Sequence, residues 1–147
     1  LQLWIYMKKI ENILVPLDGS KSSLKGLKLA TRIAKSLDAK ITGINVVRYS
    51  SGFQFPVSSE IKQKQIKGAE TIITEAKDSI KKDKVSFIGK IIKGENIGKS
   101  ISKFSKTKKF DLIIIGSRGP DPGSEVFLGS VANYLLHKSK IPITVVK

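Results

Sequence analysis

Two hydrophobic periodicities alternate along this chain. Short, continuous runs of apolar and β-branched residues are typical of strands buried in a parallel sheet, and they occupy 10–17, 41–47, 85–92, 111–115 and 141–146. Between them, apolar residues recur every three or four positions, which is typical of amphipathic helices. The predicted helices run from Ser20 or Ser22 to about 37, over 61–80, from Glu95 or Asn96 to about 105, and over about 130–138.

The order strand, helix, strand, repeated to a fifth strand, predicts a single α/β domain with a parallel sheet and helices on both faces. In an open sheet of this kind a ligand sits beyond the carboxyl ends of the strands, where the strand order reverses. We expect this domain to span 8–147. Residues 1–7 are expected to be a non-native or disordered extension, because Met7 followed by two lysines is typical of a natural start.

Composition excludes several classes of protein. A chain of 147 residues is long enough for one domain with a substantial core. The absence of cysteine excludes disulfides, thiolate metal sites and cysteine nucleophiles. No apolar run approaches the ~20 residues that span a membrane, and no basic leader precedes an apolar segment. We therefore expect a cytoplasmic protein with no membrane partner.

The formal net charge of +15 suggests an anionic partner. Only three of the 27 basic residues are arginine, the residue type that base readout and bidentate phosphate contacts favour. The lysines are spread over every predicted helix. We therefore favour a solvated, highly charged surface and do not expect a dedicated nucleic-acid site, although a polyanion can still bind without specificity.

The candidate ligand-binding residues lie around the end of the fourth predicted strand. Gly116 ends this strand, Gly119 follows after two residues, and Gly129-Ser130 comes after nine more, where the last helix begins. A strand end, a glycine loop and a helix start together suit phosphate, because free amides and the positive end of the helix dipole point at the ligand. Glycine also allows close approach and positive φ. The alternative is that these residues have structural roles only, at a strand end, in a turn and at a helix cap.

The motif Gly116-x-x-Gly119, nine residues, Gly129-Ser130, then a short helix and Ile-Pro-Ile-Thr-Val-Val, resembles the ATP-binding signature of the universal stress proteins. The segment Ile-Leu-Val-Pro-Leu-Asp-Gly-Ser at 13–20 is similar to the opening of that family, so the resemblance covers 8–147. It implies a Rossmann-like fold of the adenine nucleotide alpha hydrolase type, with strand order 3-2-1-4-5. Strands one and four would then flank one crevice.

The resemblance also implies a role for each site residue. Asp18 would accept a hydrogen bond from a ribose hydroxyl, with a capping or turn aspartate as the alternative. Pro16 and Val46 would form apolar walls for adenine. The remaining nucleotide-binding candidates follow the first strand or line the phosphate loop, namely Leu17, Gly116, Ser117, Arg118, Gly119, Gly129, Ser130 and Val131. Arg118 meets a phosphate or points to solvent.

The loop departs from the family pattern at Pro120-Asp121-Pro122. Two prolines remove two amide donors and stiffen the loop, which puts nucleotide affinity in doubt. Asp121 is a candidate to help hold Mg²⁺ on the phosphates of a bound ATP. His137, the single histidine, is expected on the surface, in the last helical turn.

The resemblance implies a regulatory module in stress response that binds ATP or AMP, together with an unidentified protein partner. It also implies a homodimer formed through the apolar edge strand Ile141 to Val146, unless the N-terminal residues cover that edge. We expect no enzymatic activity beyond slow ATP hydrolysis, since no base for water is evident. Two alternatives remain: a slow ATPase, and a protein of the same fold that has lost ATP and works through protein or polyanion binding.

Overall fold

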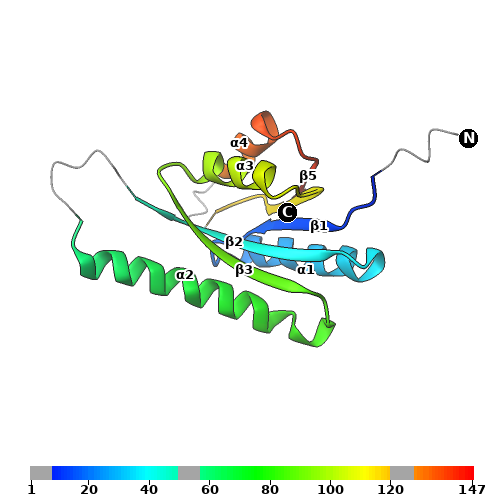
Figure 1. Ribbon diagram of the computed structural model, residues 1–147, viewed down its shortest axis with the longest axis horizontal. Coiled ribbons are helices and arrows are strands. Elements are labelled where there is room, and N and C mark those ends of the chain that lie inside the picture. The colour runs from blue at the N-terminus through cyan, green and yellow to red at the C-terminus, as the bar shows by residue number, and fades with distance from the viewer. Residues whose placement is uncertain (1–7, 50–56, 120–127) are drawn as a thin grey trace, which may run out of the picture.

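The computed structural model describes residues 8–49, 57–119 and 128–147. Five parallel strands form one sheet in the order β3-β2-β1-β4-β5 (Figure 1). The strands are β1 (Asn12–Pro16), β2 (Lys40–Arg48), β3 (Phe87–Gly94), β4 (Leu112–Gly116) and β5 (Ile143–Val146). This order confirms the 3-2-1-4-5 arrangement, and the strand order reverses between the paired strands β1 and β4.

Helices cover both faces of this sheet, as predicted. They are α1 (Lys21–Leu37), α2 (Ser59–Ser79), α3 (Ile97–Thr107) and α4 (Ser130–Lys138), and the short 3-10 helix η2 (Lys81–Asp83) follows α2. Residues of α1 and α2 pack in one hydrophobic core, and residues of α3 and α4 pack in a second core on the opposite face. Figure 1 shows α2 below the sheet, and α3 and α4 above it.

The helix starts follow from local capping. The Ser20 hydroxyl accepts a hydrogen bond from the Ser23 amide at 3.0 Å, and the Asn96 amide oxygen accepts one from the Lys99 amide at 2.9 Å. These residues satisfy amides that the first helical turn leaves without partners. The structure therefore selects Ser20 rather than Ser22, and Asn96 rather than Glu95, as the helix caps.

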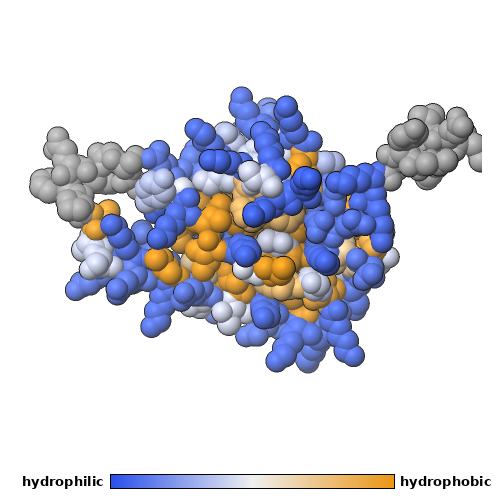
Figure 2. Space-filling view, viewed as in Figure 1, coloured by the Kyte–Doolittle hydropathy of each residue, from blue (hydrophilic) through white to orange (hydrophobic). Residues whose placement is uncertain are grey.

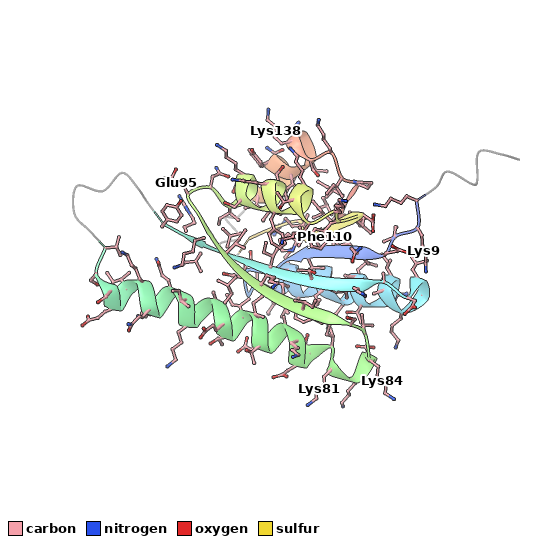
Figure 3. The ribbon with its side chains drawn as sticks, viewed as in Figure 1. Lys9, Lys81, Lys84, Glu95, Phe110 and Lys138 are labelled. Carbon is pink, nitrogen blue, oxygen red and sulfur yellow. The ribbon has the colours of Figure 1, made fainter. Side chains whose placement is uncertain are left out.

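Strands β1 and β4 are buried because a layer of helices covers each face of the sheet at their position. Ile13 and Val15 point into the α1–α2 core, and Leu14 points into the α3–α4 core; all three are fully buried. Phe110, just before β4, lies in the interior (Figure 3), with its ring centroid 5.7 Å from that of Phe104. This double coverage explains why the sequences of β1 and β4 read as continuous apolar runs.

The Asp111 side chain links β4 to β1 at the end of the sheet where both strands begin. One oxygen of Asp111 accepts the amides of Glu11 and Asn12 at 3.0 Å each, and the other lies 2.6 Å from Lys8 Nζ. Burial raises the pKa of Asp111, but the Lys8 ammonium and the two amides outweigh burial and leave this pKa below its usual value. The hydrogen bond to Asp111 raises the pKa of Lys8.

The edges of the sheet are β3 and β5, so the prediction of β5 as an edge strand is confirmed. Figure 2 shows apolar surface in the middle of one face, between α2 and α3. In the edge strand β3, Ile88 is 50% exposed. Within 8–49, 57–119 and 128–147, no helix is long and apolar enough to cross a membrane. The same residues contain no cluster of three or more His, Cys, Asp or Glu suited to a metal ion.

Candidate functional site

A cavity of about 550 Å³ lies at the carboxyl ends of β1, β2 and β4, beside the first turn of α4. Ten of the eleven residues that the sequence singled out line this cavity, and they are Pro16, Leu17, Asp18, Val46, Gly116, Arg118, Gly119, Gly129, Ser130 and Val131. Ser117 is the exception. The expected crevice between the ends of strands one and four is therefore present.

The wall after β1 is tied to β2 by two hydrogen bonds. The Leu17 amide donates to the carbonyl of Ile44 at 2.8 Å, and the Asn45 side-chain amide donates to the carbonyl of Leu17 at 2.7 Å. These bonds continue the contact between the strands beyond the last residue of β1. They hold the backbone before Asp18 against the neighbouring strand, so that Asp18 is positioned by its rigid surroundings.

Asp18 uses its two carboxylate oxygens differently. Oδ1 accepts the Ser20 amide at 2.9 Å, which is the turn interaction that the sequence left open as an alternative. Oδ2 faces the glycine loop, since a Cβ built on Gly119 would lie 3.7 Å from it. The side chain therefore stabilises its own turn and also presents one oxygen at the cavity wall.

The backbone after β4 is largely occupied within the protein. The Ser117 amide donates to Val146 at 2.8 Å, the Ser117 carbonyl accepts the Gly129 amide at 2.6 Å, and the Arg118 amide donates to the Ser22 hydroxyl at 3.2 Å. The expectation of a loop with free amides is therefore wrong for Ser117, Arg118 and Gly129. Ser117 is buried by these contacts, which is why it does not line the cavity.

The amides at the start of α4 differ from those after β4 in their hydrogen bonding. Gly129 precedes the helix with φ −64° and ψ 155°, and no side chain of the described residues caps the helix. The first helical bond joins the Asn133 amide to the Gly129 carbonyl at 2.9 Å. Within the described residues, no hydrogen bond uses the amides of Ser130 and Val131. The positive end of the α4 dipole thus reaches the cavity with two amide donors that no other described residue engages.

Gly116 and Gly129 of the motif allow a close approach of backbone segments and do not supply left-handed backbone. Gly116, Gly119 and Gly129 lack positive φ, which corrects one of our expectations. A Cβ on Gly116 would lie 2.5 Å from the carbonyl carbon and Oγ of Ser22, and one on Gly129 would lie 3.3 Å from the Gly119 amide nitrogen. Gly116 therefore lets α1 pack on the end of β4, and Gly129 lets the helix start pack on the loop.

Several cavity residues escaped the sequence analysis. Asn45 is 9% exposed and Arg48 is exposed; both come from β2, while Ile97 and Ile101 come from α3. An asparagine inside the apolar run 41–47 was a signal that could have been used, because a buried amide requires hydrogen-bond partners. The isoleucines carry no such signal, since their spacing is that of any amphipathic helix.

The lining combines apolar and charged chemistry. The side chains of Pro16, Val46 and Ile101 form apolar wall, while Arg48 and Arg118 supply positive charge. Among the described lining residues, Asp18 is the single carboxylate. Such a cavity suits a ligand with an apolar ring, hydroxyl groups and an anionic tail.

Some sequence expectations fall elsewhere. Pro120, Asp121 and Pro122 lie outside the described residues, as do 1–7 and most of the loop between β2 and α2. His137 is exposed in the last turn of α4, as predicted, and lines a neighbouring groove instead of this cavity.

The comparisons with known proteins agree on one family. The sequence model of the universal stress protein family matches residues 9–147. The universal stress protein MJ0531 of Methanocaldococcus jannaschii is 31% identical over 144 residues, covering 93% of this chain and 82% of that protein. The solved structure of hypothetical protein MJ0577 is 25% identical with a TM-score of 0.83, covering 95% of this chain and 97% of its own. The universal stress protein from Archaeoglobus fulgidus in complex with dAMP is 18% identical, with a TM-score of 0.71 over 95% of this chain and all (100%) of that one.

Proposed function

This chain belongs to the universal stress protein family, and we propose that it binds an adenine nucleotide in the cavity between β1, β4 and α4. The observation that carries the proposal is the pairing of uncapped α4 amides with an apolar wall across one cavity. A volume of about 550 Å³ lies within the range of small-molecule and cofactor sites.

Each part of the nucleotide has a candidate partner. Adenine lies against Pro16, Val46 and the α3 side of the cavity. The ribose hydroxyls donate to Asp18 Oδ2, the oxygen that the turn leaves available. The phosphates accept the amides of Ser130 and Val131, with the Ser130 hydroxyl and the α4 dipole adding to the attraction.

A structural relative supports this choice of ligand. The Archaeoglobus fulgidus protein of the same fold was solved with dAMP. We extend the proposal to ATP, because two arginines line the cavity and favour additional negative charge. Mg²⁺ would accompany a triphosphate, with Asp121 as the candidate ligand from outside the described residues.

The proposed role is binding and regulation in stress response. Asp18 is the single carboxylate among the described lining residues, and one of its oxygens already accepts the Ser20 amide, so it is poorly placed to activate water. Nucleotide in the cavity would change the surface that Gly119, Gly129 and the first turn of α4 present to a protein partner, in a cytoplasmic setting. The shift between the free and bound states of this surface would be as large as the difference in their nucleotide affinity.

We further propose a homodimer formed through β5. This strand is at the sheet edge, and its four residues are all half-buried, with Ile143, Val145 and Val146 apolar. An apolar edge strand favours pairing with another strand, and a second copy of β5 related by a two-fold axis supplies one.

Thermal unfolding with nucleotide tests the binding proposal. ATP or AMP at 100 times its dissociation constant stabilises the folded state by about 2.7 kcal/mol, which raises the melting temperature by roughly 5–10 °C. GTP serves as the control for base recognition. No shift with ATP or AMP at millimolar concentration, for folded protein, would show that the chain has lost nucleotide binding.

The Asp18 role has its own test. The variant Asp18→Asn keeps an oxygen for the Ser20 amide, so the melting temperature of the free protein should stay unchanged, while ATP affinity falls about tenfold. Dideoxy-ATP, which lacks both ribose hydroxyls, should bind wild type and variant equally. A variant that loses affinity for dideoxy-ATP as well would place Asp18 elsewhere than at the ribose.

A further inference from the structure

Basic residues form a continuous stripe along the outer face of α1. Lys21, Lys25, Lys28, Arg32 and Lys35 are all exposed. They recur at alternating steps of four and three residues, the spacing of neighbours on one helix face. With a rise of about 1.5 Å per residue, successive charges are about 4.5–6 Å apart along the helix axis.

Acidic residues are distributed unevenly around this stripe. Helix α1 contains no Asp or Glu, whereas α2, beside it on the same face of the sheet, contains Glu60, Glu70, Glu75 and Asp78. Of the stripe, Lys35 pairs with Asp83 at 3.2 Å. The four cations from Lys21 to Arg32 form no ion pair with any described residue.

The position of the first cation is unfavourable for the helix itself. Lys21 is the first residue of α1, and the first turn contains no acidic residue. A cation at this end opposes the helix dipole, which favours carboxylates there. The positive potential at this end is thus kept at the expense of helix stability, which indicates a use for it beyond folding.

From these three observations we infer that the outer face of α1 binds the phosphate backbone of a nucleic-acid duplex without reading its sequence. Lysines act as point charges toward phosphates, and arginine, the residue for base readout, occurs once in the stripe. Helix α1 has no aromatic residue on which an unpaired base could stack, so the regular phosphates of a duplex are a better match than a single strand. The apolar side of α1 packs into the core, which leaves little to insert into a lipid bilayer.

The expected salt dependence follows from the number of charges. If Lys21 to Arg32 neutralise four phosphates, the slope of log affinity against log salt is about −3.6 for B-form DNA. Affinity then falls on the order of 100-fold between 50 mM and 200 mM salt. Binding is in the micromolar range or weaker near physiological salt, as for other sequence-independent contacts.

The test is fluorescence anisotropy of a labelled 24-base-pair DNA duplex of arbitrary sequence, titrated with full-length protein at several salt concentrations. The stripe variant carries Lys21→Gln, Lys25→Gln and Lys28→Gln. The matched control carries Lys62→Gln, Lys64→Gln and Lys67→Gln on α2, which removes the same charge from a helix that also carries carboxylates. The stripe variant should bind at least tenfold more weakly at 50 mM salt, with a slope shallower by about 2.7, and the control should change less than threefold.

Other outcomes overturn the proposal. Equal losses in both variants would mean that net charge alone attracts DNA. A loss confined to Lys99→Gln/Lys103→Gln/Lys106→Gln would assign binding to α3, and tight binding to anionic phosphatidylserine vesicles without duplex binding would assign a membrane.

The single substitution Lys21→Glu distinguishes a role of this charge in duplex binding from a role in helix stability. Lys21→Glu should raise the melting temperature by about 1–3 °C, because it matches the helix dipole, while it weakens duplex binding. If Lys21→Glu does not both raise the melting temperature and weaken duplex binding, the proposed role of the stripe is contradicted. Nucleotide binding is measured separately, and its loss or survival does not decide this proposal, since Lys21, Lys25 and Lys28 do not line the cavity.

Discussion

Two glycines of one motif should respond differently to the same substitution: Gly116→Ala should reduce stability, and Gly119→Ala should reduce nucleotide affinity. Gly116→Ala places a methyl group 2.5 Å from the carbonyl carbon and Oγ of Ser22 and 2.6 Å from its carbonyl oxygen. Two of these atoms are backbone of α1, so the helix must shift away from β4. Among the described residues, a Cβ on Gly119 would meet only Asp18 Oδ2, at 3.7 Å, which is ordinary contact.

The magnitudes follow from these distances. Overpacking that forces a backbone shift costs about 1–3 kcal/mol, so Gly116→Ala should lower the melting temperature by roughly 2–10 °C. Gly119→Ala should stay within about 0.5 kcal/mol of wild type, since nothing is displaced. Its methyl group does narrow the cavity beside Asp18, and we expect ATP affinity to fall several-fold.

Urea unfolding followed by circular dichroism measures the stabilities, and calorimetry measures nucleotide affinity. The double variant Ser22→Ala/Gly116→Ala removes the Oγ contact but leaves both backbone contacts, so most of the loss should remain. If Gly116→Ala unfolds at the same urea concentration as wild type, the close approach of α1 to β4 is refuted. If Gly119→Ala is the less stable of the two, the division between packing and ligand roles is refuted.

Three further predictions concern other parts of the fold. Gly68→Ala, in the exposed part of α2 where the added methyl has no described atom within 4 Å beyond its own stretch of helix, should raise the free energy of unfolding by about 0.5–1 kcal/mol in urea unfolding. Asp111→Asn should lower it by roughly 1–2 kcal/mol at pH 7 because charge-assisted bonds to two amides are weakened. The lowered pKa of Asp111 means that its contribution is complete above about pH 4, the unfolded value, and is lost as pH falls through the folded pKa, so wild type and variant should converge in acid. Asn45→Leu leaves the carbonyl of Leu17 without its 2.7 Å donor and should cost about 1–3 kcal/mol by thermal unfolding, and a neutral result would contradict that bond.

Local signals predicted most of the elements. The caps at Ser20 and Asn96 and the helical spacing of apolar residues placed α1 and α3 within a residue or two of their observed starts. Strand ends were less accurate: β3 begins at Phe87 instead of 85, after Lys84 takes a left-handed φ of 55°. The fifth strand begins at Ile143 instead of 141, because Pro142 has no amide to donate and the Ile141 amide donates to Ser139.

The amino-acid sequence by itself determined the alternation of strands and helices, the absence of thiol chemistry, and the glycine that ends β4. These properties depend on neighbours a few positions apart along the chain. Tertiary structure alone decided which amides remain available. Arg118 donates to a serine 96 positions away, and Ser117 turns inward to bond β5 and Gly129. Such partners are set by strand order and helix packing, which bring distant segments together, and no local pattern records them.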